Sequence, residues 1–345
     1  MLSVLKSVFL AIVADVIYAS RSSCHGPQLH KMLAKITGSL RPLSSFFLLL
    51  LVLCSPFSSP LANAQAETRV IILGTGTPVP DANRSGPGVA VITNGEAYVF
   101  DAGGGMVKKA MQAWDKYNLP ELYPQDIKYL FITHLHSDHI HDIAELSGHR
   151  WWGRQQRLSV YGPKGLSEYV GHMNDMLAIE ADIRAAGTPE QLVTDRHGYL
   201  ANATEIEDGI VFSNADITVE AFTVPHGEIR PAFGYRVTTA DKTIVISGDT
   251  TYSDALAEKA RGADILIHEV YSGDQLSRQS EFWQDYHGHS HTSGEQVAAV
   301  ANIAKPDLVV LYHILFFNAS PEDIVGEVKR TYDGDVVMAN DLDMF

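Results

Sequence analysis

The sequence predicts an α+β protein, a sandwich of strands and helices that forms a single domain. Short runs of branched and aromatic residues, each long enough for a buried strand, occur in both halves of residues 69–345. Stretches with helical periodicity separate these runs, and we find no repeat of fixed period and no internal linker. The composition, 46% hydrophobic and 19% charged, is typical of a folded globular protein.

The first half of this domain is predicted to be rich in strands. Residues 89–93 and 97–101 form an expected hairpin across Asn94-Gly95, a dipeptide that suits a tight turn. The other expected strands are 69–74, 129–132 and 158–161, and the expected helices are 106–117 and 166–183. Residues 184–208 are polar and weakly patterned, so we expect an insertion or a lid there.

The second half continues the mixture of strands and helices. The expected strands are 217–224, 232–237, 243–247, 265–269, 308–312 and 336–338. The expected helices are 293–303 and 321–332. Residues 271–290 match no motif, and we expect this insertion, together with the lid, to set substrate preference.

Residues 1–64 are predicted to lie outside the domain. A segment that begins at Met32 has two basic residues, then the apolar run 46–54, then a small-x-small site ending at Ala64. These are the marks of a secretory signal. On this interpretation Met32 is the true start, residues 65–345 are the mature domain, and the protein is periplasmic or secreted, touching the membrane only through its signal. An uncleaved anchor is the alternative, although the apolar run is short for a span of about 20 residues.

Charge and cysteine content narrow the expected partners. Without residues 1–64 the chain holds 21 basic and 40 acidic residues, a formal charge of −19. Such a surface repels phosphate backbones, so we expect no nucleic-acid partner. Both cysteines, Cys24 and Cys54, precede residue 65. The predicted mature domain therefore offers no thiolate as ligand or nucleophile.

A cluster of potential metal ligands follows the expected strand 129–132. It has the order His134-Leu-His136-Ser-Asp138-His139. Residues two apart in an extended stretch point to the same side, so His134 and His136 can hold one ion. As the chain turns into a helix, Asp138 and His139 are aimed toward a second ion. Imidazole and carboxylate are the ligands that an ion such as zinc prefers.

Further candidate ligands stand just past later strands. His226, Asp249 and His313 each come at the end of an expected strand, which brings the set to seven. Seven ligands suit two ions that share a bridging carboxylate. Asp101 also ends a strand, and two roles remain open for it: capping the following turn, or orienting a metal-binding histidine from behind.

The ligand cluster resembles the HxHxDH signature of the metallo-β-lactamase superfamily, and the resemblance covers about 70–345. Further stretches resemble the branch that holds ribonuclease Z and arylsulfatase-like hydrolases: Leu73-Gly-Thr-Gly-Thr-Pro-Val-Pro-Asp81, Phe100-Asp-Ala-Gly103, Tyr161-Gly-Pro-Lys-Gly165 and His226…Gly234-Tyr-Arg236. The resemblance implies a four-layer αββα sandwich with two zinc ions at one edge, Mn or Fe being possible substitutes. It assigns His134, His136 and His226 to the first ion, Asp138, His139 and His313 to the second, and Asp249 to both.

The resemblance also implies catalytic roles. A water shared by two metal ions loses a proton near neutral pH and attacks as hydroxide, and Asp138 is a candidate acceptor for its proton. His291 matches the general acid of the branch and Glu269 its orienting partner. His289, two residues away, competes with His291 for the acid role.

The sequence departs from ribonuclease Z after its last metal ligand. Ribonuclease Z places a Ser and an Arg there, whereas residues 314–317 are apolar throughout, and no basic Gly/Pro-rich arm is found. We therefore expect a periplasmic or secreted dizinc hydrolase of a small ester, an aryl sulfate or a phosphodiester. The alternatives are a ribonuclease Z-type tRNA 3′-processing nuclease and a non-catalytic metal-binding protein. A homodimer is left open.

Overall fold

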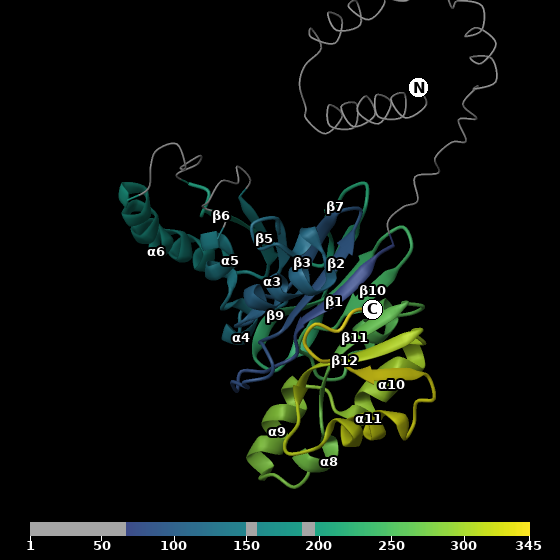
Figure 1. The fold of residues 1–345 in the computed structure, drawn as a ribbon. Helices are drawn as coiled ribbons and strands as arrows, with labels where there is room; N and C mark the ends of the chain where they lie inside the picture. Colours follow the sequence, from purple (N-terminus) through teal and green to yellow (C-terminus); the bar gives the residue numbers. More distant parts are fainter. Residues whose placement is uncertain (1–66, 150–156, 188–196) are drawn as a thin grey trace, which may run out of the picture. The chain divides into compact units, whose positions relative to one another are not determined.

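The structure is a computed structural model and describes residues 67–149, 157–187 and 197–345 (Figure 1). It contains two sheets. The first has strands β1 to β6 in sequence order: Arg69–Gly74, Gly88–Thr93, Glu96–Phe100, Tyr129–Phe131, Leu158–Gly162 and Ala201–Glu205. The second has the order β13 to β7, and its strands β7 to β13 are Gly209–Ser213, Thr218–His226, Ile229–Thr238, Thr243–Ile246, Ile265–Tyr271, Leu308–Leu315 and Asp335–Met338.

The core lies between the two sheets and beneath helices on their outer faces. Alternation along β1 shows why: Val70 and Ile72 pack against the second sheet, whereas Ile71 and Leu73 pack under helices of the first half. Phe131 is fully buried in the middle layer, stacked between Phe100 and Tyr161 at centroid distances of 5.0 and 5.1 Å. The predicted α+β sandwich is confirmed, and its layers run helix, sheet, sheet, helix.

Helices complete the outer layers. Those of the first half are α3 Met106–Tyr117, the 3-10 turn η1 Pro120–Leu122, α4 Ser137–Ile140, α5 Ile143–His149 and α6 Leu166–Gly187. Those of the second half are α7 Asp254–Lys259, α8 Gly273–Leu276, α9 Glu281–Ser290, α10 Gly294–Ala304 and α11 Pro321–Lys329. No helix in the described part of the chain is long and apolar enough to cross a membrane.

Several stretches differ from the sequence-based expectation, among them helices α5 and α7, which were not predicted, and the helix expected over 321–332, which ends at Lys329. The helix predicted to end at 183 continues to Gly187, and the expected lid contains the edge strand β6, although residues 188–196 lie outside the described part. The expected insertion 271–290 holds α8 and α9. Strand β7 is an edge strand that was not predicted, because its five residues show no regular alternation of buried and exposed positions.

Parallel pairing gathers the site. β3, β4 and β5 run parallel, as do β10, β11 and β12, so the carboxyl ends of each group meet at one edge of its sheet. The predicted signal segment 1–64 lies outside the described residues, and the domain boundary at residue 65 and the location outside the cytoplasm stay predictions.

Candidate metal centre

The turn from β4 into α4 builds the first part of the site. The backbone N–H of Thr133 donates to Asp101 Oδ1 over 2.8 Å, which ties the end of β4 to the end of β3. His134 Nε2 and His136 Nδ1 then lie 2.9 Å apart. Helix α4 starts at Ser137 and turns Asp138 and His139 inward, where both are buried. A side chain at Gly103 would clash with the backbone of α4 at Asp138, so this close packing requires glycine.

The structure brings all seven candidate ligands together in two groups. His134, His136, His226 and Asp249 offer ligand atoms within 4.8 Å of one another. Asp138, His139 and His313 form the second group under the same limit.

Asp249 lies between the two groups. Its Oδ2 is 3.9 Å from His134 Nε2 and 4.0 Å from His226 Nε2 on one side. The same oxygen is 3.4 Å from His139 Nε2 and 3.3 Å from His313 Nε2 on the other. One carboxylate oxygen therefore lies within 4.0 Å of ring nitrogens from both groups, so Asp249 would be available as a shared ligand.

Unpaired buried atoms test whether a cation fits here. Within the described residues, Asp138 Oδ1, His139 Nε2, Asp249 Oδ1 and His313 Nδ1 are buried without a hydrogen-bond partner. Such atoms cost about 1–3 kcal/mol each when left unsatisfied. A divalent ion coordinated by several of these groups would offset that cost, and nitrogen and carboxylate donors are those that zinc prefers. The cluster fits a divalent metal ion.

The charge states of the ligands also favour a cation. Burial and the nearby ring of His139 lower the pKa of His134 well below its ordinary value, so its ring is neutral and its lone pair is free. Burial would raise the pKa of Asp249, but the rings of His313 and His139 hold it well below its ordinary value. An ionised carboxylate beside the neutral ring of His134 is suited to bind a divalent ion.

Groups behind the ligands fix the orientation of two rings. His139 Nδ1 donates to Asp101 Oδ2 over 2.9 Å, and His226 Nδ1 donates to the carbonyl of Ser290 over 2.7 Å. Each bond leaves Nε2 directed at the metal position. Of the two roles left open for Asp101, the structure supports the orienting one. Asp101 and His313 both have a positive φ, +60° and +43°, which is a strained conformation that tends to occur at functional sites.

Replacing Asp101 with Asn tests this contact. We expect metal affinity to fall by about 10- to 100-fold, because an amide cannot hold the His139 ring as a carboxylate does. Competition with a chelator, measured on the purified full chain, gives the affinity. Asp142→Asn is the matched control, since Asp142 is also a buried aspartate but accepts from the Val107 N–H at the start of α3. Equal affinity in the two variants would contradict the orienting role.

The pair predicted from the sequence for proton transfer lies beside the ligands. His291 Nδ1 is 3.1 Å from Glu269 Oε1, and that oxygen also accepts from the Thr250 N–H. Burial alone would lower the pKa of His291, but Glu269 raises it to about 9, so the ring is protonated at neutral pH. The His289 side chain is 74% exposed, and its ring donates to the carbonyl of Asp285 in the same helix rather than contacting Glu269. His291 also lies within ligand distance of Asp249 and His313.

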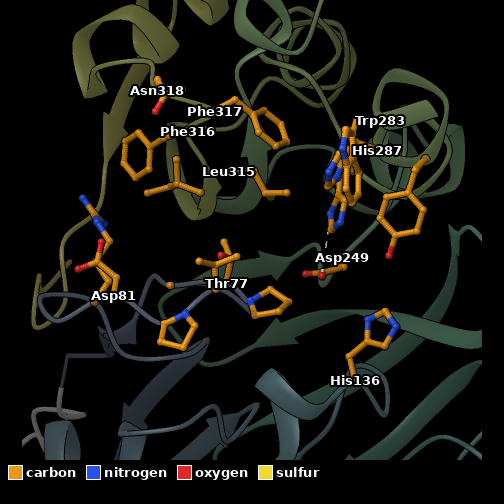
Figure 2. Close-up of a pocket in the computed structure, with 18 of the residues that line it drawn as sticks. Thr77, Asp81, His136, Asp249, Trp283, His287, Leu315, Phe316, Phe317 and Asn318 are labelled. Atoms are coloured by element: carbon orange, nitrogen blue, oxygen red, sulfur yellow. Dashed lines mark ion pairs between the residues drawn. The ribbon is translucent and has the colours of Figure 1, made fainter. Parts of the chain in front are cut away.

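A cavity of about 640 Å³ opens directly onto the metal centre. His136, Asp249 and His291 form part of its lining (Figure 2). Figure 2 shows Trp283 and His287 on one side, with Phe316 and Phe317 facing them from the other. The apolar run that follows His313 is therefore a wall of the cavity. Trp283 and Tyr286 were missed as site residues, and their only signal was a run of aromatic residues in a stretch that matched no motif.

Comparison with known proteins identifies relatives over most of the chain. A family described as the beta-lactamase superfamily domain matches residues 97–314. A ribonuclease Z from Mycobacterium sp. (strain KMS) is 32% identical over 251 residues, covering 71% of this chain and 84% of that protein. A ribonuclease Z from Mycobacterium avium (strain 104) is 28% identical over 290 residues, covering 79% of this chain and 96% of that protein.

Solved structures share the fold. The metallo-beta-lactamase fold protein YhfI from Bacillus subtilis superposes with a TM-score of 0.62 at 17% identity, covering 81% of this chain and 99% of that one. The short form of human tRNase Z gives a TM-score of 0.56 at 22% identity, covering 80% of this chain and 98% of that one.

Two expectations from the sequence are wrong. The predicted activity on an aryl sulfate or another small ester is overturned by relatives that are named ribonuclease Z, which favour the ribonuclease Z alternative. The expectation that nucleic acid is no partner is overturned by the same relatives. The small-ester expectation rested on the apolar residues 314–317, the missing basic arm and the net charge, and the net charge sums over the whole surface, whereas binding depends on the residues beside the site. The cavity is lined by Arg84 together with Asp81 and Asp249, whereas the formal charge of −19 counts every residue from 65 to 345.

Proposed function

Because the chain belongs to the metallo-β-lactamase superfamily, in the branch that contains ribonuclease Z, we propose that it is a metal-dependent endoribonuclease with precursor tRNA as candidate substrate. The observation that carries this proposal is the pair of ligand groups around Asp249, with a buried His–Glu pair beside them. Hydrolysis of a phosphodiester needs an activated water, a polarised phosphoryl oxygen and a proton for the leaving oxygen, and this arrangement can supply all three.

The ligand groups determine where the ions bind. His134, His136 and His226 would hold one ion, and Asp138, His139 and His313 a second, with Asp249 shared between them. Zinc fits this donor set best. When bound, such ions lower the pKa of water and polarise the phosphoryl oxygen.

The chain's own residues move the protons. Burial would raise the pKa of Asp138, but the hydrogen bond from His313 and the nearby His139 bring it below its ordinary value, so Asp138 is ionised. It is therefore able to accept a proton from the attacking water. Protonated His291 donates to the leaving ribose oxygen, and Glu269 holds the ring in position for this transfer.

The direct test uses the full chain loaded with zinc and a precursor tRNA that carries a 3′ extension. We expect one endonucleolytic cut and no cut by His136→Ala, which loses a first-group ligand. A mature tRNA without the extension serves as the substrate control. If the fully loaded protein cleaves neither the precursor nor an unstructured RNA of the same length, the proposed function is wrong.

A further inference from the structure

Helix α9 carries aromatic side chains that lie between the solvent and the metal centre. Trp283 and His287 lie four residues apart and share one face of α9, and His291 follows directly after the helix as its C-cap residue. The Trp283 and His287 rings are stacked with centroids 5.6 Å apart and an interplanar angle of 24°. The His287 and His291 centroids lie 5.7 Å apart. Tyr286, one position before His287, lines the same cavity.

The opposite wall is also aromatic. Phe316 and Phe317 follow β12, and the Phe317 ring meets His287 edge-on at a centroid distance of 4.8 Å. The guanidinium of Arg84 stands over the Phe316 ring at 5.1 Å. We call the space between these walls, bounded by Trp283, Tyr286, Phe316 and Phe317, the aromatic slot (Figure 2).

Two aromatic side chains of the slot are about half exposed to solvent, although burial of their apolar surface would be favourable. Trp283 is 46% exposed and Tyr286 is 49% exposed, although both have large apolar surfaces. Adjacent exposed aromatic side chains at the mouth of a cavity are typical of a binding surface. Flat aromatic faces bind other flat rings by stacking.

The slot is continuous with the metal centre, which restricts what enters it. The cavity that holds Trp283 and Phe317 also includes Asp249 and His291. Its occupant is therefore part of the molecule that reacts there. If the proposed function holds, that molecule is RNA, and the flat, uncharged group nearest to a reacting phosphate is the base of the adjoining nucleotide.

We infer that the aromatic slot binds an unpaired nucleobase next to the scissile phosphate, stacked against Trp283. The base must be unpaired, because bases inside an A-form helix are not accessible to side chains in this way. Stacking also suits the charge of this domain. A protein with a formal charge of −19 over residues 65–345 gains little general attraction for phosphates, whereas stacking does not depend on net charge.

Substrates without a base at this position test the inference. The probes are hairpin RNAs with a single-stranded 3′ tail, either unmodified or abasic at the nucleotide on the 5′ or the 3′ side of the cut. We expect the zinc-loaded full chain to cleave one abasic RNA with kcat/KM about 10-fold lower, mainly through a higher KM. Trp283→Ala should lose about as much on the unmodified RNA and should no longer distinguish it from the abasic one. Trp283→Phe should retain most of the preference.

Phe282→Ala is the matched control. Phe282 precedes Trp283 on α9 and is 68% exposed, but it does not line the cavity. We expect this variant to keep the wild-type preference. Zinc content and circular dichroism show whether Trp283→Ala folds. If it does not fold, the rates of the wild-type protein and of Trp283→Phe on the unmodified and abasic RNAs still test whether the slot binds a base.

The outcomes separate the inference from the function on which it rests. If the wild-type protein cleaves unmodified and both abasic RNAs equally, the slot does not bind a base, although the nuclease activity stands. Stacking would also be contradicted if a folded Trp283→Ala variant still preferred the unmodified RNA over the abasic RNA by the same factor as the wild-type protein. If the wild-type protein cleaves no RNA, the proposed function fails and the inference fails with it.

Discussion

Replacing Asp249 with Asn is expected to lower kcat/KM by at least about 1,000-fold, which corresponds to about 4 kcal/mol of transition-state stabilisation. Asp249 Oδ2 is the one carboxylate oxygen of the cluster that lies within 4.0 Å of ring nitrogens from both ligand groups. An amide keeps the shape but loses the charge that a bridging ligand supplies to two cations. We therefore expect the metal content per chain to fall together with the rate.

Elemental analysis of the purified variant and single-turnover cleavage of RNA measure the two effects. Asp142→Asn changes a buried aspartate outside the ligand groups and should keep both metal and rate, because the amide oxygen still accepts from the Val107 N–H. Full metal content with a normal rate in Asp249→Asn would show that the carboxylate is not a shared ligand. Loss of metal from Asp142→Asn would point instead to a general loss of folding.

Much of the site was accessible from the sequence because its signals are local. His134, His136, Asp138 and His139 fall within six residues, and their spacing on a strand and the next helix determines where they point. His226, Asp249 and His313 were found because each stands at the end of an expected strand, and the parallel pairing of β10, β11 and β12 brings Asp249 and His313 to one edge of the sheet. The structure places all seven in the two groups that the resemblance implied. The resemblance also suggested Glu269 and His291, which form a hydrogen-bonded pair.

The parts that were missed depend on contacts between distant segments. Trp283 and Tyr286 matter because α9 holds them opposite Phe317, from a stretch about 30 residues further along the chain. Nothing in the 271–290 sequence distinguishes such exposed rings from rings that pack in a core. Strands β6 and β7 were missed because edge strands need little alternation of polar and apolar residues. The sequence shows that the residues after His313 are apolar. Only the structure shows that they form one wall of a cavity, because the opposite wall comes from α9.

The wrong expectation that nucleic acid is no partner also arose because composition does not show which side chains come together at the site. Net charge is available from composition, but recognition depends on the few side chains that line the approach to the site. The inferred role of the aromatic slot illustrates this distinction, since Trp283 would hold a base of a polyanion by stacking, without a positive charge of its own. An acidic domain can therefore act on RNA if its contacts near the cut are directed at bases.

Replacing His291 with Ala is expected to leave metal content unchanged and to slow RNA cleavage by about 100- to 10,000-fold, the usual contribution of a general acid. The ribose oxygen is a poor leaving group, so its departure depends on a proton. Bis(p-nitrophenyl) phosphate has a leaving group that needs no proton, and we expect the same variant to hydrolyse it within about 10-fold of the wild-type rate. The loss of rate on RNA divided by the loss of rate on bis(p-nitrophenyl) phosphate measures the contribution of proton donation by His291.

His289→Ala is the control for this experiment, because that ring stands at the end of the same helix and bonds only to Asp285. It should cleave both substrates at the wild-type rate, and a selective loss on RNA would transfer the acid role to His289. His291 also lies within ligand distance of Asp249 and His313. If His291→Ala loses metal and slows on both substrates equally, His291 is a ligand. An unchanged rate on RNA would leave the buried pair with Glu269 without a catalytic function.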